Sequence, residues 1–410
     1  MAVFTYAVDN TDGGPFNFPF AYVDDLSDKF NLANGELTIP VEGLYYFSMS
    51  AGAPANSTVD FTLFVENKEI DPKLIRTHSR GTGPDTISRD ALLQLPQDTV
   101  VTMQSDGRLY SDAYKVTSLT AFSVSDTMKD PKYFFAYLEE GGRTNSTRIS
   151  FPNIILNNQN DYDPATNQYR CPITAIYVFT FSVFVNPGDN VNAKLRVGFE
   201  SYELVRNHTK HGDDGGDVLS RTVLALCYSN MTVGVELDNG AVKGGMDLTT
   251  GMMGFSYTVD NEKTRDAYWQ LTTDEQFIND NDEIVDMPFT NQDLPGGDFA
   301  KQENGKFTSV RCPYSGWYYV HISASTQADF PLNLFITVND IPQVAVFRAS
   351  RWHNGGVDYI SRSAIVQCRE GYEMKVQMGP QTAIGKKFNS GREVRGTSFL
   401  GFMIYSDDEV

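Results

Sequence analysis

The chain has 410 residues, with 33 basic against 52 acidic side chains and a formal net charge of −19. At 41% hydrophobic and 21% charged residues, it has the composition of a globular protein of about two to four domains. The acidic balance excludes nucleic acid and anionic membrane as expected partners, since both would repel the chain, and no apolar stretch reaches the ~18–20 residues of a membrane span. Divalent cations, cationic surfaces and uncharged glycans stay open as partners.

Two motifs occur three times along the chain. The first reads TIPVEGLYYF at 38–47, RCPITAIYVF at 170–179 and RCPYSGWYYV at 311–320. The second reads SRDALL at 88–93, SRTVLA at 220–225 and SRSAIV at 361–366. The offsets between repeats, 132 residues and then 141 residues, are the size of whole domains. We therefore predict three tandem domains over residues 1–126, 133–260 and 267–410.

The residue pattern inside each repeat predicts an all-β fold. Short runs rich in aromatic and branched residues, such as 44–49, 60–65 and 100–104, alternate with Gly, Asn, Asp and Pro. This pattern is typical of an antiparallel sandwich or jelly roll. The charged segments 127–132 and 261–266 are the expected linkers, and six residues at ~3.3 Å each reach ~20 Å at most. The domains must therefore lie side by side.

The four cysteines form two pairs with equal spacing. Cys171 and Cys227 lie 56 residues apart, as do Cys312 and Cys368, and the first repeat has apolar residues at both equivalent positions. Because both partners are present or replaced together, we predict two intradomain disulfides; the alternative is four buried free thiols. The spacing does not fit a zinc site. Disulfides would place the protein in an oxidising compartment and favour secretion, although the N-terminal MAVFTYAVDN shows no signal-peptide pattern.

An extended aromatic pattern marks the second repeat. It consists of Phe151, Asn157, Tyr162, Tyr169, Tyr177, Phe179 and Phe181, with the sequence YDPAT at 162–166. These residues resemble the globular domain of the complement C1q family, a tumour-necrosis-factor-like jelly roll. The first repeat keeps Gly43, Tyr45 and Phe47 in register, and the third keeps Gly316 and Tyr318 but shifts the upstream spacing.

The resemblance implies two stacked antiparallel sheets per domain and assembly as compact trimers. It also implies that Cys171 and Cys227 lie on neighbouring antiparallel strands. Three domains on one chain favour an intramolecular pseudo-trimer, because linking raises the effective concentration of each domain for the next. The alternative is a string of domains that each trimerise with other chains, and higher oligomers stay open.

One repeated loop carries the candidate metal ligands. His78, His211 and His353 precede Asp85, Asp217 and Asp358. The Asp resembles the family's Ca²⁺ ligand near the threefold axis, but the family's additional upstream Asp is not matched. Imidazoles beside carboxylates suit Zn²⁺ or another transition ion better than Ca²⁺, which prefers oxygen ligands. The alternative is an Asp that caps the turn beside a solvated His.

Few other residues suggest a site. Trp352 lies on an expected loop tip, where an exposed indole could hold a sugar ring or a partner surface; it could equally pack under its own loop. Sequons begin at Asn56, Asn145, Asn207 and Asn230, about as many as chance provides. No nucleophile elbow or phosphate loop is present, so we expect neither an enzyme nor an organic cofactor.

Together these patterns predict a secreted, non-enzymatic, lectin-like recognition protein that binds glycans or extracellular protein surfaces through apical loops, with a divalent cation as candidate cofactor. The alternative is a structural or assembly protein of an extracellular matrix, egg coat, mineral or adhesive.

Overall fold

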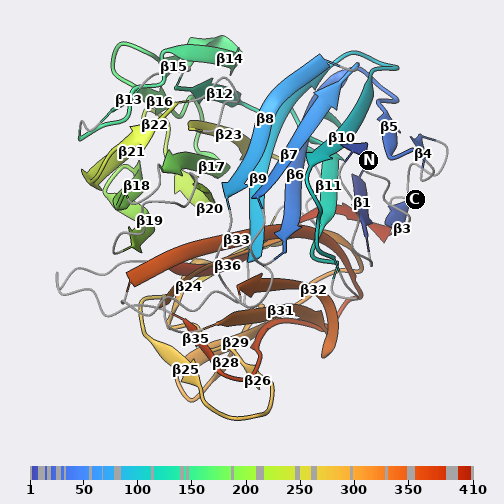
Figure 1. The fold of residues 1–410 in the computed structure, drawn as a ribbon, viewed down its shortest axis with the longest axis vertical. Coiled ribbons are helices and arrows are strands. Elements are labelled where there is room, and N and C mark those ends of the chain that lie inside the picture. The colour runs from blue at the N-terminus through green and yellow to red at the C-terminus, as the bar shows by residue number, and fades with distance from the viewer. Residues whose placement is uncertain are drawn as a thin grey trace.

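Each repeat forms two stacked antiparallel sheets in a computed structural model (Figure 1). The structure describes residues 2–7, 14–15, 20–24, 29–31, 34–54, 58–66, 68–77, 85–111, 115–138, 143–144, 147–185, 189–208, 217–244, 250–259, 266–295, 299–327, 331–348, 356–384 and 396–407. We call the three repeats units 1, 2 and 3, and call the sheet that faces the centre of the molecule the inner sheet of its unit.

In unit 1 the inner sheet has the strand order β3-β1-β11-β6-β9 and the outer sheet β4-β5-β10-β7-β8. The inner strands are β1 (Ala2–Tyr6), β3 (Phe20–Asp24), β6 (Gly43–Ala53), β9 (Asp85–Leu95) and β11 (Ser118–Ser123). The outer strands are β4 (Phe30–Asn31), β5 (Glu36–Thr38), β7 (Thr58–Val65), β8 (Lys68–Thr77) and β10 (Val100–Asp106), with β2 (Gly14–Pro15) beside β10.

Unit 2 repeats this plan with the orders β14-β12-β23-β17-β20 and β15-β16-β21-β18-β19. Its inner strands are β12 (Tyr133–Tyr137), β14 (Asn153–Asn157), β17 (Ala175–Val185), β20 (Asp217–Cys227) and β23 (Gly251–Tyr257). Its outer strands are β15 (Tyr162–Asp163), β16 (Gln168–Arg170), β18 (Val191–Val197), β19 (Glu200–His208) and β21 (Thr232–Asn239). Short additions are β13 (Arg143–Thr144), β22 (Val242–Lys243) and the 3₁₀ turn η1 (Asn158–Asn160).

Unit 3 has the orders β27-β24-β36-β30-β33 and β28-β29-β34-β31-β32. Its inner strands are β24 (Tyr268–Thr273), β27 (Asn291–Pro295), β30 (Gly316–Gln327), β33 (Gly356–Cys368) and β36 (Thr397–Ser406). Its outer strands are β28 (Ala300–Glu303), β29 (Lys306–Arg311), β31 (Leu332–Val338), β32 (Ile341–Arg348) and β34 (Glu373–Met378). Three short strands complete it: β25 (Phe277–Asn279), β26 (Val285–Asp286) and β35 (Thr382–Ile384).

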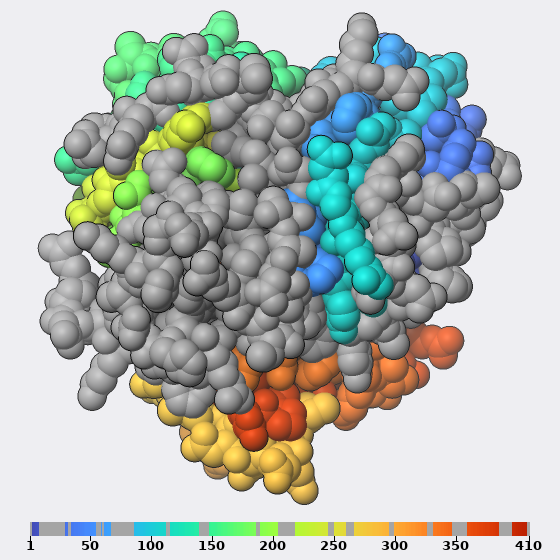
Figure 2. All heavy atoms as spheres, in the orientation of Figure 1, coloured from blue at the N-terminus to red at the C-terminus, as the bar shows by residue number. Residues whose placement is uncertain are grey.

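The sheets continue from unit to unit and close a ring. The outer β8 of unit 1 pairs with the inner β20 of unit 2, β19 of unit 2 pairs with β33 of unit 3, and β32 of unit 3 pairs with β9 of unit 1. The three units therefore form three lobes around a pseudo-threefold axis, visible as the blue, green and orange regions of Figure 2. The predicted intramolecular pseudo-trimer is confirmed.

The first repeated motif leads into the central strands, β6, β17 and β30. Strand β6 is buried along its whole length, because one of its faces covers the core of unit 1 and the other faces the axis. On the axial side, Tyr46, Phe255 and Tyr319 bring together all three units, with ring centroids 5.7 Å apart for Tyr46–Phe255 and 5.6 Å for Tyr46–Tyr319. Burial on two faces explains why each of these strands begins with a continuous apolar and aromatic run, over 43–47, 175–179 and 316–320.

The segment after unit 1 differs from a plain linker. A one-turn helix, α1 (Val124–Thr127), is capped by the Ser123 hydroxyl, which accepts from the Asp126 amide at 3.1 Å. Met128 is buried in the same central cluster as Tyr46 and Phe255. Because charged residues surround Met128, this contact was not predicted from the sequence. The second expected linker, 261–266, lies outside the described residues except for Asp266.

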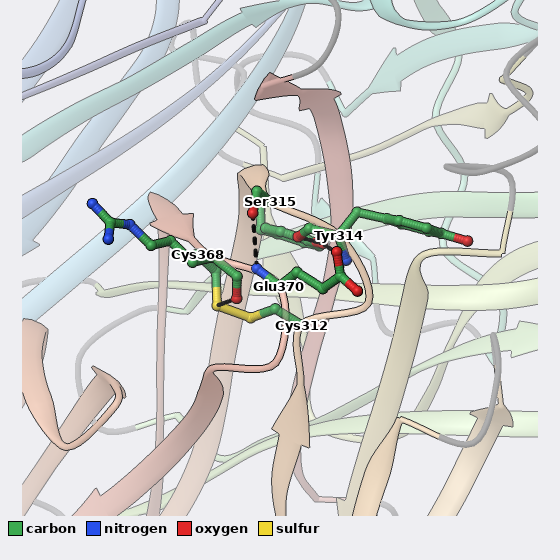
Figure 3. The surroundings of a disulfide bond; sticks show 7 residues. Cys312, Tyr314, Ser315, Cys368 and Glu370 are labelled. Carbon is green, nitrogen blue, oxygen red and sulfur yellow. Dashed lines mark hydrogen bonds between the residues drawn. A yellow bond between two sulfur atoms is a disulfide. The ribbon is translucent and has the colours of Figure 1, made fainter.

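The predicted disulfide of unit 3 is confirmed. Cys312 and Cys368 are bonded with a Cα–Cα distance of 6.2 Å, and beside them the Ser315 hydroxyl accepts from the Glu370 amide at 2.9 Å (Figure 3). The disulfide joins the chain before β30 to the end of β33, two neighbouring antiparallel strands.

The predicted disulfide of unit 2 is wrong in this structure, where Cys171 and Cys227 are free, buried thiols. The pKa of Cys227 is raised by its hydrogen bond with Cys171 and by burial. The two cysteine pairs thus have the same spacing, but one is a disulfide and the other is a pair of free thiols.

We expect native protein, handled without reductant, to contain two thiols per chain that react slowly with a soluble disulfide reagent, because both are buried. After denaturation both should react at once. Intact mass before and after alkylation in denaturant measures the count, with Cys171→Ala as the matched variant. Finding no thiol after denaturation would show that the second disulfide forms as well.

Candidate functional site

The strands that follow the predicted ligand loops meet at one end of the axis, which we call the apical end. The backbone of Asp85 at the start of β9 pairs with Arg348, and that of Asp217 at the start of β20 pairs with Arg76. At the start of β33, Gly356 pairs with His208, two residues before Asp358. The described strand ends that flank the three loops therefore pair between neighbouring units, and the loops themselves lie outside the described residues.

The candidate metal ligands fall outside the part of the chain that the structure describes. His78, His211, His353 and Trp352 lie outside the described residues, and so do the side chains of Asp85, Asp217 and Asp358. Within the described part of the chain, no group of three His, Cys, Asp or Glu side chains is placed to hold a metal ion. The cation site stays a prediction about the apical loops.

Below the apical end, the second repeated motif lines the axis with polar side chains. The hydroxyls of Ser88 and Ser361, from units 1 and 3, lie 2.9 Å apart. One layer further, Asp90 of unit 1 accepts from the Thr222 hydroxyl of unit 2 at 2.8 Å and from that of Thr180 at 3.3 Å. Burial raises the pKa of Asp90, and its hydrogen bonds oppose that rise.

A chain of hydrogen bonds continues from this layer through unit 3. The amide of Thr222 donates to Nε2 of His321 at 3.3 Å, which leaves the proton on Nδ1, 2.9 Å from the Ser363 hydroxyl. Ser363 lies 2.7 Å from the Tyr319 hydroxyl, which lies 2.9 Å from that of Tyr46. Burial, and secondarily Arg221, lower the pKa of His321 to about 3. All these groups are buried, so we call them the axial polar network.

The arginine of each SR motif is buried beside the network. Arg362 donates to the carbonyls of Ala345 and Lys115 and, at 3.1 Å, to the Ser118 hydroxyl, so it joins unit 3 to unit 1. Arg221 donates to the Glu203 carbonyl and lies 5.8 Å from the Tyr202 ring and 5.7 Å from the Tyr359 ring of unit 3. The SR repetition was visible in the sequence, but its role in holding units together was not.

A polar hollow of about 410 Å³ lies on the outer sheet of unit 2. It is lined by Asn160, Asp161, Asp163, Thr166, Gln168, Arg170 and Thr232. Asp163 of the YDPAT sequence accepts from the Ala165 amide at 2.9 Å and from the Thr166 hydroxyl at 3.0 Å, so this residue shapes a turn. The motif therefore has a local structural role in the wall of the hollow.

The candidate glycosylation sites are scattered. Asn230 is exposed in the turn after β20, whereas the backbone of Asn207 pairs with Val357 between units 2 and 3. Asn56 and Asn145 lie outside the described residues. The structure leaves modification at these positions a prediction.

Comparison with known proteins gives two findings. A family model described as the C1q domain matches residues 6–123 and 133–255, which fall on units 1 and 2. Among solved structures, the globular domain of zebrafish complement 1qA protein is similar to part of this chain, with 13% sequence identity over 32% of this chain and 100% of that one, and a TM-score of 0.26.

The buried imidazole predicts an acid-sensitive fold. In the unfolded chain His321 takes up a proton below about pH 6.5, but in the folded chain only near pH 3. The stability that depends on neutral His321 is therefore complete above about pH 6.5 and is lost as the pH falls towards 3, by about 3 kcal/mol between pH 7 and pH 4. Denaturant unfolding of wild type and His321→Gln should show a flatter pH profile for the variant. Asp90 contributes to both proteins alike, so parallel profiles would contradict this assignment.

Proposed function

Because the chain belongs to the C1q domain family, we propose that it is a secreted, non-enzymatic recognition protein that binds glycans or protein surfaces through its apical loops. The observation that carries this proposal is the cyclic strand pairing at Asp85, Asp217 and Gly356. It brings the strands that flank three non-identical loops to one end of a β scaffold, and loops at such a place commonly carry binding functions.

Secretion is supported by the Cys312–Cys368 disulfide, since such bonds persist mainly in oxidising compartments. Within the described residues, no helix is both long and apolar enough to cross a membrane. The buried thiols of Cys171 and Cys227 are compatible with the same compartment, because their burial and raised pKa slow oxidation.

A divalent cation at the apical end deepens this proposal. His78, His211 and His353 with Asp85, Asp217 and Asp358 supply the donors, imidazole nitrogen and carboxylate oxygen, that suit a transition ion. An ion held there would stiffen the three loops and could itself contact a ligand hydroxyl or carboxylate.

A second candidate function, structural assembly, is favoured by the opposite end of the molecule. Strand β19 runs from Glu200 to the apical His208, so the turn before it lies at the far end, where Phe199 is 99% exposed. The equivalent turn of unit 3 exposes Ile341 by 63%. Exposed apolar residues of this size mark contact sites in many proteins, so these turns could join one molecule to the next.

The proposal predicts cation-dependent binding at the apical end. A glycan array and a panel of extracellular proteins should give saturable binding that EDTA reduces at least about tenfold, and bound metal near one ion per chain. Changing His78, His211 and His353 to Ala should remove both the metal and the binding, because the donors are lost. Trp352→Ala should weaken binding while the metal stays.

Phe199→Ser is the matched control for this experiment, since it changes the far end alone. Ligand binding should be unaffected by it. A blank array and protein panel would refute the recognition proposal, whereas concentration-dependent polymerisation that Phe199→Ser abolishes would establish the assembly function instead.

A further inference from the structure

The residues that face the axis differ between the units at equivalent positions. Asp90 of unit 1 corresponds to Thr222 and Ser363, and Ser48 corresponds to Thr180 and His321. All six are buried. A homotrimer built from any one unit would place three copies of the same side chain in each layer, whereas this chain places one carboxylate, one imidazole and several hydroxyls.

The contacts of the axial polar network run mainly between units. Asp90 of unit 1 accepts from Thr222 and Thr180 of unit 2, and the amide of Thr222 donates to His321 of unit 3. The hydroxyls of Tyr319 and Tyr46 then link unit 3 back to unit 1. Each unit thus supplies groups that the other two need.

The direction of the donors explains why one carboxylate fits. A hydroxyl donates one hydrogen bond and also accepts. A chain of hydroxyls that all donate in the same direction must therefore end on a group that only accepts. The chain starts at the Nδ1 proton of His321 and passes through Ser363 and Tyr319 to Tyr46. Next to this end lies Asp90, whose pKa the Tyr46 hydroxyl lowers and which is a pure acceptor when ionised.

We propose that Asp90 is a pairing-specificity residue: its buried carboxylate fits unit 1 to units 2 and 3 of the same chain and prevents unit 1 from trimerising with copies of itself. Three copies of unit 1 would bring three carboxylates to one buried layer, where each would keep the Ser48 hydroxyl of its own unit but lose the threonine donors of unit 2. Unit 2, with Thr180 and Thr222 and with Val178 in place of Tyr46, would meet no such penalty with its own copies. The choice of partner units is therefore made by Asp90 of unit 1.

The neighbours of Asp90 leave it without a countercharge in its own layer. Tyr46 and Tyr319 face it as neutral hydroxyls, since burial raises the pKa of both. His321 is neutral at physiological pH, with Arg221 near enough to lower its pKa further. A second carboxylate in this layer would therefore meet the first one with only neutral donors between them.

The test places a second carboxylate in the layer of the full-length chain. Thr222→Asp should raise the unfolding equilibrium constant at pH 7 by about 100-fold or more, because two buried like charges meet. Thr222→Asn, matched in size but uncharged, should change it by less than about tenfold. The Asp90→Thr, Thr222→Asp double variant has one carboxylate again and should recover most of the loss. Equal effects of Asp and Asn at position 222, or no recovery in the double variant, would overturn the proposal.

A refolding experiment tests the choice of partner units separately from the stability of the folded chain. Wild type diluted from denaturant at rising protein concentration should return as single chains, whereas Asp90→Thr should give a growing fraction of multi-chain species. The same fraction for both proteins would overturn the selective role. Neither measurement uses a ligand, so failure here would leave the recognition proposal standing.

Discussion

The structure depends on three central strands that are each buried on both faces. One face of β6, β17 and β30 covers the core of its own unit, and the other contributes to a cluster shared by Tyr46, Phe255 and Tyr319. A unit separated from its neighbours would expose the axial face, and apolar surface transferred to water costs about 25 cal/mol per Å². The lobes are therefore distinct in topology but not independent in stability. The cyclic pairing of outer and inner sheets follows from the same packing.

An apolar axis alone would hold three units together without distinguishing them. The axial polar network adds that distinction, since Asp90, Thr222 and His321 are complementary only when one copy of each unit is present. Buried polar groups of this kind cost stability when unpaired and specify register when paired. The same order fixes which loops stand next to which at the apical end. A recognition surface made of three different loops needs such an order, whereas three identical loops would not.

Much of this architecture could be predicted from the sequence, because it is encoded in repetition. The motifs around Tyr46, Val178 and Tyr319 gave the three units, and short linkers required them to be neighbours. The contacts at the axis were harder to predict, because Thr222 and Asp90 are 132 residues apart and Ser88 and Ser361 are 273 apart. Their positions in the repeat register become informative only once the units are placed around one axis. The thiol state of Cys171 and Cys227 could not be predicted from a spacing shared with the bonded pair. At the apical end, the sequence predicted that the loops converge. Whether His78, His211 and His353 bind a metal there is a prediction that the binding experiment tests.

One chain closes its own pseudo-trimer, with each unit used once. The mass of the intact protein under native conditions tests this most directly, by light scattering or native mass spectrometry over a wide range of concentration. We expect a species of one chain, 45.7 kDa. A species with the mass of three chains, stable on dilution, would show instead that units of different chains trimerise, and would contradict it.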